Sequence, residues 1–269
     1  MRCLMDILPD KNAPIGVMDS GMGGISVLRE LVRLMPNERF IFYGDSANAP
    51  YGSRDTEEIY QLTENAVKKL LAHNVKAVVI ACNTASSAAG AKLRAAYPEL
   101  PIVAIEPALK PAVISCSGGR VVVLATEATL REKKFARLLE EWQGRAEIIK
   151  LPLPGLPEFV ERGELDSPVL RKFLQDYFAV LSDRPVDAVV LGCTHYPFVR
   201  KAIKELLGGQ VRVFDGAAGT ARQLRRRLYK LGLLTDAANT AREKILWLNS
   251  SPDAKMLELS RKLFQIKID

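Results

Sequence analysis

An apolar octapeptide occurs twice in this chain, and each copy ends in a cysteine. Val75–Cys82 aligns without gaps on Val186–Cys193, with five of the eight positions identical. Neither copy shows the alternation of a half-buried strand, so both have the pattern of a strand that helices cover on both faces of a parallel sheet. Buried strands resemble one another by chance, but a cysteine at the same place in both copies favours an internal repeat.

Apolar runs of strand length alternate with helical patterns along the chain. We expect helices at Ile25–Met35 and Thr56–His73, and helices between strands indicate βαβ units and an α/β fold with parallel sheets. After about Leu234 the pattern predicts peripheral helices, with Trp247 packed against the body. The expected strands are Ile15–Met18, Phe40–Tyr43, Lys76–Ala81, Ile102–Ile105, Arg120–Ala125, Glu147–Leu151, Ala188–Leu191 and Val211–Phe214.

The repeat predicts two similar doubly wound α/β domains related by pseudo-twofold symmetry. A length of 269 residues suits two domains. We place 1–106 and 217–269 in the first domain, with Cys82, and 107–216 in the second, with Cys193. Because ligands bind at the carboxyl ends of parallel strands, we expect the active site in the cleft between the two domains.

Composition excludes several classes of protein. A hydrophobic content of 48% excludes disorder, and no apolar run approaches the ~20 residues of a membrane span. The first ten residues lack the shape of a signal peptide, so we expect a cytoplasmic protein without membrane contact. Four cysteines without a C-x-x-C pair and two histidines predict no metal site. The net charge of +7 fits acidic partners, but beyond Arg225–Arg227 there is no basic stripe, so we expect no nucleic acid.

Short polar side chains and two thiols follow the predicted strands. They lie in Asp19–Ser20, Cys82–Thr84, Thr126–Thr129 and Cys193–His195, and the loop Ala49–Gly52 adds to them. The glycine cluster Gly21–Gly24 lacks the spacing of a nucleotide-binding loop. We expect its glycines to let a ligand carboxylate approach the amide groups at the start of the next helix.

Two thiols at equivalent ends of two repeats suit proton transfer on opposite faces of one carbon. One thiolate removes a proton from a stereocentre and the other thiol supplies one, which inverts the centre without a cofactor. A thiol with a pKa of about 8.5 is a poor base for an amino acid α-carbon. We expect His195 and Asp19 to assist proton movement, and Ser20, Asn83, Thr84 and Thr194 to hold the substrate carboxylate and stabilise the carbanion.

From Pro14 to Leu234 the sequence resembles the glutamate racemases of the aspartate/glutamate racemase superfamily. The resemblance is carried by Gly16–Gly24, Tyr43–Ser46, Pro50–Gly52, Ala81–Ser86 and Gly192–Pro197. It implies cofactor-independent interconversion of L- and D-glutamate, which supplies D-glutamate for peptidoglycan. It also implies catalytic roles for Cys82, Cys193, Asp19, His195 and Glu161. The implied substrate contacts are Asp19, Ser20, Tyr51, Gly52, Asn83, Thr84, Thr126, Thr129, Thr194 and His195.

Other functions stay open at this point. Aspartate racemase is the nearest alternative, since it too needs a carboxylate-binding cleft between two cysteines. A hydrolase with one cysteine as nucleophile and His195 as base would need only one of the two thiols. The hypothesis of a nucleic-acid-binding protein is supported only by the positive net charge. The partner we expect is small-molecule glutamate, and a homodimer stays open because the sequence does not determine the oligomeric state.

Overall fold

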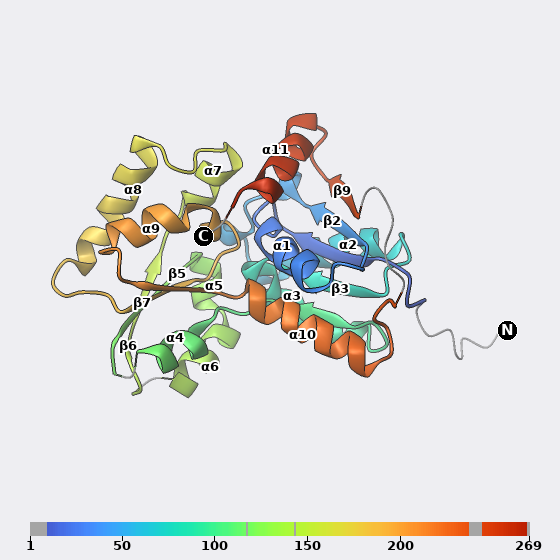
Figure 1. Ribbon diagram of the computed structural model, residues 1–269, viewed down its shortest axis with the longest axis horizontal. Helices are drawn as coiled ribbons and strands as arrows, with labels where there is room; N and C mark the ends of the chain where they lie inside the picture. Colours follow the sequence, from blue (N-terminus) through green and yellow to red (C-terminus); the bar gives the residue numbers. More distant parts are fainter. Residues whose placement is uncertain (1–9, 117, 143, 237–243, 268–269) are drawn as a thin grey trace.

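The computed structural model describes residues 10–116, 118–142, 144–236 and 244–267. Its strands form two separate parallel sheets, which lie in two halves of the molecule (Figure 1). The first sheet has the order β4-β3-β1-β2-β9 and the second has the order β6-β5-β7-β8. The strands are β1 (Ile15–Asp19), β2 (Phe40–Gly44), β3 (Ala77–Ile80), β4 (Ile102–Ala104), β5 (Arg120–Ala125), β6 (Glu147–Pro152), β7 (Ala188–Leu191), β8 (Arg212–Asp215) and β9 (Ile245–Asn249).

The strand order confirms the internal repeat. Read from β4, the first sheet runs β4-β3-β1-β2, and read from β8 the second runs β8-β7-β5-β6. Each strand of the second sheet therefore takes the place of the strand four earlier in the chain. Cys82 and Cys193 come at the same distance after the ends of β3 and β7. The predicted fold class is confirmed, while the exact domain limits stay a prediction.

Helices cover both faces of each sheet, because successive buried residues of a strand point to opposite sides. On the first sheet, α1 (Ile25–Leu34), α10 (Ala217–Lys230) and α11 (Ala254–Gln265) pack on one face, and α2 (Thr56–Leu71) and α3 (Asn83–Ala96) on the other. On the second, α4 (Leu109–Ser115) and α6 (Lys133–Trp142) oppose α7 (Leu156–Glu161), α8 (Pro168–Phe178) and α9 (Arg200–Leu206). The short α5 (Glu127–Arg131) follows β5.

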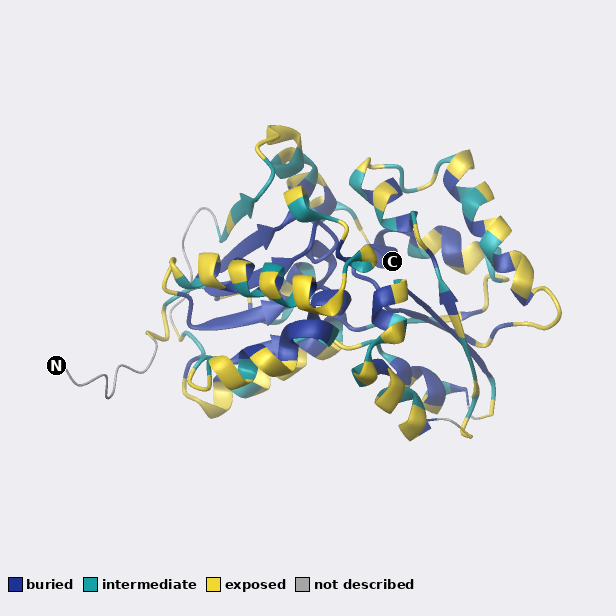
Figure 2. Cartoon of the chain, turned by 180° about the vertical axis from the view of Figure 1, so that it is seen from behind, coloured by how far each residue is buried: buried dark blue, intermediate teal, exposed yellow. Residues whose placement is uncertain are grey.

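Burial follows this layering. The inner strands β1, β2, β3, β5 and β7 are buried along their whole length, whereas the edge strands β6, β8 and β9 are only partly buried and the outer faces of the helices are exposed (Figure 2). One core cluster runs through both halves, since it contains Ile15 and Val17 of β1 together with Val122 and Leu124 of β5. Among the described helices, none combines the length and apolar character needed to cross a membrane.

The segment after Leu234 differs from the prediction. Part of it is helical, as α11 shows, but β9 is a strand that extends the first sheet beside β2 (Figure 1). The helical interpretation is wrong there because a run as short as Ile245–Leu248 has no periodicity that separates a strand from a buried helix. Trp247 does pack against the body, with its ring 5.7 Å from the rings of Phe42 and Phe264.

Candidate active site

A cavity of about 380 Å³ lies between the two halves, and both repeated cysteines line it. A larger hollow, of about 1050 Å³, contains neither of them. Of the predicted site residues, Asp19 and Thr129 are absent from the lining, and both are fully buried behind it. The lining consists of Ser20, Ser46, Ala49, Pro50, Tyr51, Gly52, Ser53, Cys82, Asn83, Thr84, Thr126, Glu127, Leu153, Pro154, Gly155, Pro157, Glu158, Glu161, Cys193, Thr194 and His195.

Cys82 is held as a neutral thiol at the start of α3. Its sulfur lies 3.4 Å from the amide nitrogen of Ala85 and 3.3 Å from the Ser20 hydroxyl. These contacts and the helix N-terminus favour a thiolate. Burial and the nearby Asp19 carboxylate outweigh them and raise the pKa of Cys82 to about 12. Cys82 is therefore protonated at neutral pH.

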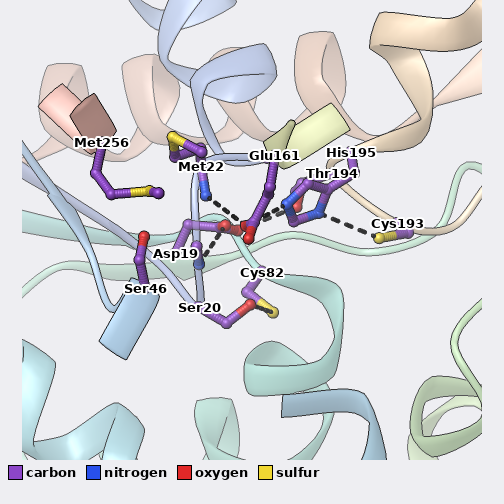
Figure 3. Close-up of polar contacts among 12 residues, drawn as sticks. Asp19, Ser20, Met22, Ser46, Cys82, Glu161, Cys193, Thr194, His195 and Met256 are labelled. Carbon is purple, nitrogen blue, oxygen red and sulfur yellow. Dashed lines mark hydrogen bonds and ion pairs between the residues drawn. The ribbon is translucent and has the colours of Figure 1, made fainter. Parts of the chain in front are cut away.

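Cys193 lies at one end of a series of polar contacts that continues through His195 to Glu161 (Figure 3). The His195 Nδ1 is 3.7 Å from the Cys193 sulfur, and its Nε2 is 3.0 Å from Glu161 Oε1. Burial acts to lower the pKa of His195, but its contacts with Cys193 and Glu161 raise that pKa well above the usual value. The imidazole is therefore a cation that can donate to a Cys193 thiolate and to Glu161.

Glu161 is ionised in this arrangement. Burial acts to raise its pKa, but the hydrogen bond and the charge of His195, together with the Met22 amide, lower it overall. Because Glu161 is the last residue of α7, the end of this helix fixes the position of the carboxylate.

Asp19 connects the two halves from behind the cavity. Its Oδ1 accepts a hydrogen bond from the Thr194 hydroxyl at 3.0 Å, and its Oδ2 accepts one from the Gly21 amide at the same distance. Desolvation raises the pKa of Asp19. The Asp19 carboxylate thus contacts Thr194, which lines the cavity, and the expected substrate contact of Asp19 stays a prediction.

Three threonine hydroxyls meet where the halves face each other. Thr84 Oγ1, at the start of α3, lies 3.0 Å from Thr126 Oγ1 and 3.3 Å from Thr129 Oγ1. Thr126 and Thr129, from the second half, are 2.9 Å apart. A hydroxyl can both donate and accept, so such a group can turn its hydrogens toward an anion.

The side chain of Asn83 is buried without a hydrogen-bond partner in the described part of the chain. This holds for both its Nδ2 and its Oδ1, although the residue is only 4% exposed. A buried amide with neither group satisfied costs about 1–3 kcal/mol per group. Because Asn83 lines the cavity, a ligand with both a donor and an acceptor would satisfy it.

The glycine cluster after β1 brings the backbone close to the protein's own side chains, while the expected ligand contact there stays a prediction. A Cβ at Gly21 would lie 2.1 Å from Glu161 Oε1, and one at Gly23 would lie 2.5 Å from His195 Nδ1. The Met22 amide donates to Glu161 at 3.4 Å. These glycines let the backbone of one half approach the charged side chains of the other.

Some lining residues were not predicted as contacts. Ser46 and Glu158 line the cavity, and so does Glu127, which lies within the predicted segment Thr126–Thr129 but was not singled out. We also predicted no role for Asp45, although it belongs to the segment Tyr43–Ser46 that carries the family resemblance. Its buried Oδ2 accepts a hydrogen bond of 2.6 Å from the Tyr51 hydroxyl. Burial, and then this bond, raise the pKa of Tyr51, so its hydroxyl stays neutral. Within the described residues, no cluster of three or more His, Cys, Asp or Glu could hold a metal ion.

Comparison with known proteins gives a consistent result. The chain is 47% identical over 257 residues to the glutamate racemase of Clostridium perfringens, which covers 96% of this chain and 98% of that protein. The structure resembles glutamate racemase from Francisella tularensis in complex with D-glutamate, with a TM-score of 0.82 and 26% identity over 96% of both chains. It also resembles the Escherichia coli glutamate racemase in complex with L-glutamate and the activator UDP-MurNAc-Ala, with a TM-score of 0.80, 27% identity and coverage of 93% and 95%.

The family assignment follows from these matches and from the repeated cysteines. The Asp/Glu/Hydantoin racemase family matches residues 15–224, which include both cysteines. The chain therefore belongs to the Asp/Glu/hydantoin racemase family.

Proposed function

We propose that this chain interconverts L- and D-glutamate through two thiols, without a cofactor. The observation that carries the proposal is that Cys82 and Cys193, at equivalent ends of two repeated sheets, line one cavity. A single-nucleophile hydrolase would need one thiol beside His195 and gives no role to the other. Aspartate racemase stays the alternative within the family.

The cavity has groups that suit an amino acid zwitterion. Asn83 offers an unsatisfied donor and acceptor, which match a carboxylate and an ammonium group. The hydroxyls of Thr84 and Thr126, together with Ser20 and Thr194, supply further donors, and Thr129 contacts the first two from behind the lining. Tyr51 and Gly52 close the cavity on another side. The relatives' complexes with D-glutamate and L-glutamate support glutamate as the ligand.

The two thiols differ in their surroundings. Cys193 lies 3.7 Å from the Nδ1 of the His195 cation, whereas burial and the Asp19 carboxylate raise the pKa of Cys82. In one direction the Cys193 thiolate takes the α-proton, which leaves a carbanion and a Cys193 thiol. The carbanion then takes the proton of the Cys82 thiol on its other face, which leaves a Cys82 thiolate. The reverse direction follows the same steps backwards and starts from the Cys82 thiolate and the Cys193 thiol. Before another turnover in the same direction, Cys193 releases its proton to solvent and Cys82 takes one up, so protons balance over the cycle.

Three charged residues support this transfer. His195 contacts Cys193 while the sulfur gains or loses its proton. The Glu161 carboxylate keeps the imidazole of His195 positively charged. Asp19 orients Thr194 and disfavours a thiolate on Cys82 through its own negative charge. We therefore propose positioning and electrostatic roles for Asp19 and Glu161 and a direct proton-handling role for His195.

A racemisation assay tests the proposal. The purified chain is incubated separately with L-glutamate, D-glutamate, L-aspartate and D-aspartate, without added cofactor, and the optical rotation is followed. We expect both glutamate enantiomers to converge on a racemic mixture. Activity on aspartate alone would overturn the substrate, and hydrolysis of an ester or amide without any racemisation would overturn the reaction.

Further proposals concern the cellular setting and the assembly. We propose a cytoplasmic enzyme whose D-glutamate product supplies peptidoglycan synthesis, and domain limits at 1–106 with 217–269 and at 107–216. A homodimer stays a prediction that sedimentation in solution would test.

A further inference from the structure

The C-terminal strand β9 lies outside residues 15–224, the part of the chain that the family matches. Its last residue nevertheless contacts Ser46, which lines the cavity. β9 pairs with β2 in parallel, with Asn249 opposite Gly44 (Figure 1). The next residue continues the pairing, since the Ser250 amide donates to the Gly44 carbonyl at 2.9 Å. The end of β9 therefore lies directly beside the loop that follows β2.

Side chains at the end of β9 hold that loop. The Asn249 Nδ2 donates to the Ser46 Oγ at 2.9 Å, across 203 positions of the sequence, and the Ser250 Oγ accepts from the Ala47 amide at 2.9 Å. The orientation of the Asn249 amide is fixed, because its Oδ1 accepts from the Ser251 amide, which can only donate. Gly44 leaves room for the side-chain amide of Asn249, since a Cβ at position 44 would lie 3.0 Å from Asn249 Nδ2.

The hydrogen bond from Asn249 to Ser46 determines whether the Ser46 hydroxyl donates or accepts in the cavity. Ser46 lines the cavity. Because its oxygen accepts from Asn249, its hydrogen is directed elsewhere and can be donated to an acceptor in the cavity. On the other side of the same loop, Asp45 accepts from Tyr51, so the loop is held from both sides. A substrate with two carboxylates offers the acceptor that Ser46 requires.

We propose that Asn249 is a positioning residue that sets Ser46 as a hydrogen-bond donor to a carboxylate of the substrate. The proposal rests on the proposed function for its ligand, glutamate. Asn249 acts on substrate affinity through Ser46 and does not touch the reacting α-carbon. Its effect belongs in KM, while kcat stays close to that of the wild type.

Three variants test the proposal, with KM, kcat, Tm and the Kd for D-glutamate measured on each. Asn249→Ala removes the hydrogen bond that orients Ser46 and the contact with the Ser251 amide, so KM and Kd should rise about fivefold with kcat within a factor of about two. Asn249→Asp has nearly the same shape, but its carboxylate would take the Ser46 hydrogen and repel an anionic substrate, so we expect a larger rise, about twentyfold. Leu246→Ala is the control, because Leu246 lies at an exposed position of the same strand. This substitution should change neither KM nor the Kd for D-glutamate.

The Asp variant separates this role from a merely structural one. If Asn249 only fastens the loop, Asn249→Asp should restore affinity, because a carboxylate still accepts from Ser251 and Ser46. That result, or an unchanged KM in both variants, overturns the proposal. If Asn249→Ala does not fold, Ser46→Ala and the Ser46→Ala/Asn249→Asp double variant decide, since the double variant should bind glutamate no more weakly than Asn249→Asp alone.

The outcome for the wild type distinguishes the two proposals. A wild-type chain that binds glutamate while the Asn249 variants bind it equally well overturns the role of Asn249 alone. A wild-type chain that neither binds nor racemises glutamate overturns the proposed function, and the ligand of this proposal with it.

Discussion

The difference between the two thiols can be measured through their reactivity. A thiol reacts with iodoacetamide as the thiolate. At pH 8 a pKa of about 12 leaves Cys82 ionised in roughly one molecule in ten thousand, whereas the ordinary thiol pKa of about 8.5 gives about one in four. Ionisation alone therefore slows alkylation of Cys82 by a factor of about two thousand.

The perturbation is Asp19→Asn. Desolvation is the main cause of the high pKa of Cys82, and the negative charge of Asp19 is the second. Removing that charge makes the thiolate easier to form, so the pKa should fall and alkylation at a fixed pH should become faster. Desolvation persists, so the pKa should stay above 9.

The assay is alkylation of each cysteine from pH 7 to 10.5, quantified by mass spectrometry of its peptide. Poor access lowers the rate at every pH, but only ionisation determines the shape of the profile. The rate at Cys82 should keep rising tenfold per pH unit to the end of the range. Cys116, which is also buried, is the internal control, and its profile should not respond to Asp19→Asn. A Cys82 profile that levels off by pH 9 in the wild type, or one that Asp19→Asn leaves unshifted, refutes the reasoning.

Three more outcomes follow from particular contacts. Glu161→Gln should lower the pKa of His195, so the basic limb of the plot of kcat/KM against pH should move to lower pH. Above the new pKa, kcat/KM should fall about tenfold for each unit by which the pKa of His195 drops. A basic limb that does not move would contradict a charged contact between His195 and Glu161. Gly23→Ala places a Cβ 2.5 Å from His195 Nδ1 and should cost about a hundredfold in kcat/KM, while Gly219→Ala, in open space on α10, should keep full activity. Lys76→Met removes the cation that lies 2.6 Å from the buried carboxylate of Glu38. It should lower the free energy of unfolding, measured in urea, by about 3 kcal/mol, and a decrease below about 1 kcal/mol would contradict this.

Much of the fold was predictable from the sequence because the strands are buried on both faces. Such strands are continuous apolar runs, as at Arg120–Ala125, and they stand out between helical patterns. The repeated cysteine gave the correspondence of the two halves, and the order of strands confirmed it. The edge strand β9 was missed because an edge position is only half-buried and its short apolar run has no diagnostic period.

The candidate site was predictable where a residue directly follows a strand. Cys82 and Cys193 were found this way, and both line the cavity. The orientation of a side chain is not encoded in such spacing. The spacing therefore did not reveal that the Asp19 carboxylate accepts a hydrogen bond from Thr194, and its substrate contact stays a prediction. The contact between Asn249 and Ser46 was also beyond reach, because it joins residues 203 positions apart through tertiary pairing alone.

Exchange of the substrate α-proton with solvent tests the central claim, that two thiols act on opposite faces of one carbon. Cys82→Ser and Cys193→Ser are each incubated with L-glutamate and with D-glutamate in deuterated water, and deuterium incorporation and racemisation are followed by NMR. Each variant should lose racemisation by at least about a thousandfold, and any remaining exchange should be confined to one enantiomer, a different one in each variant. Racemisation at the wild-type rate in either variant would contradict the account.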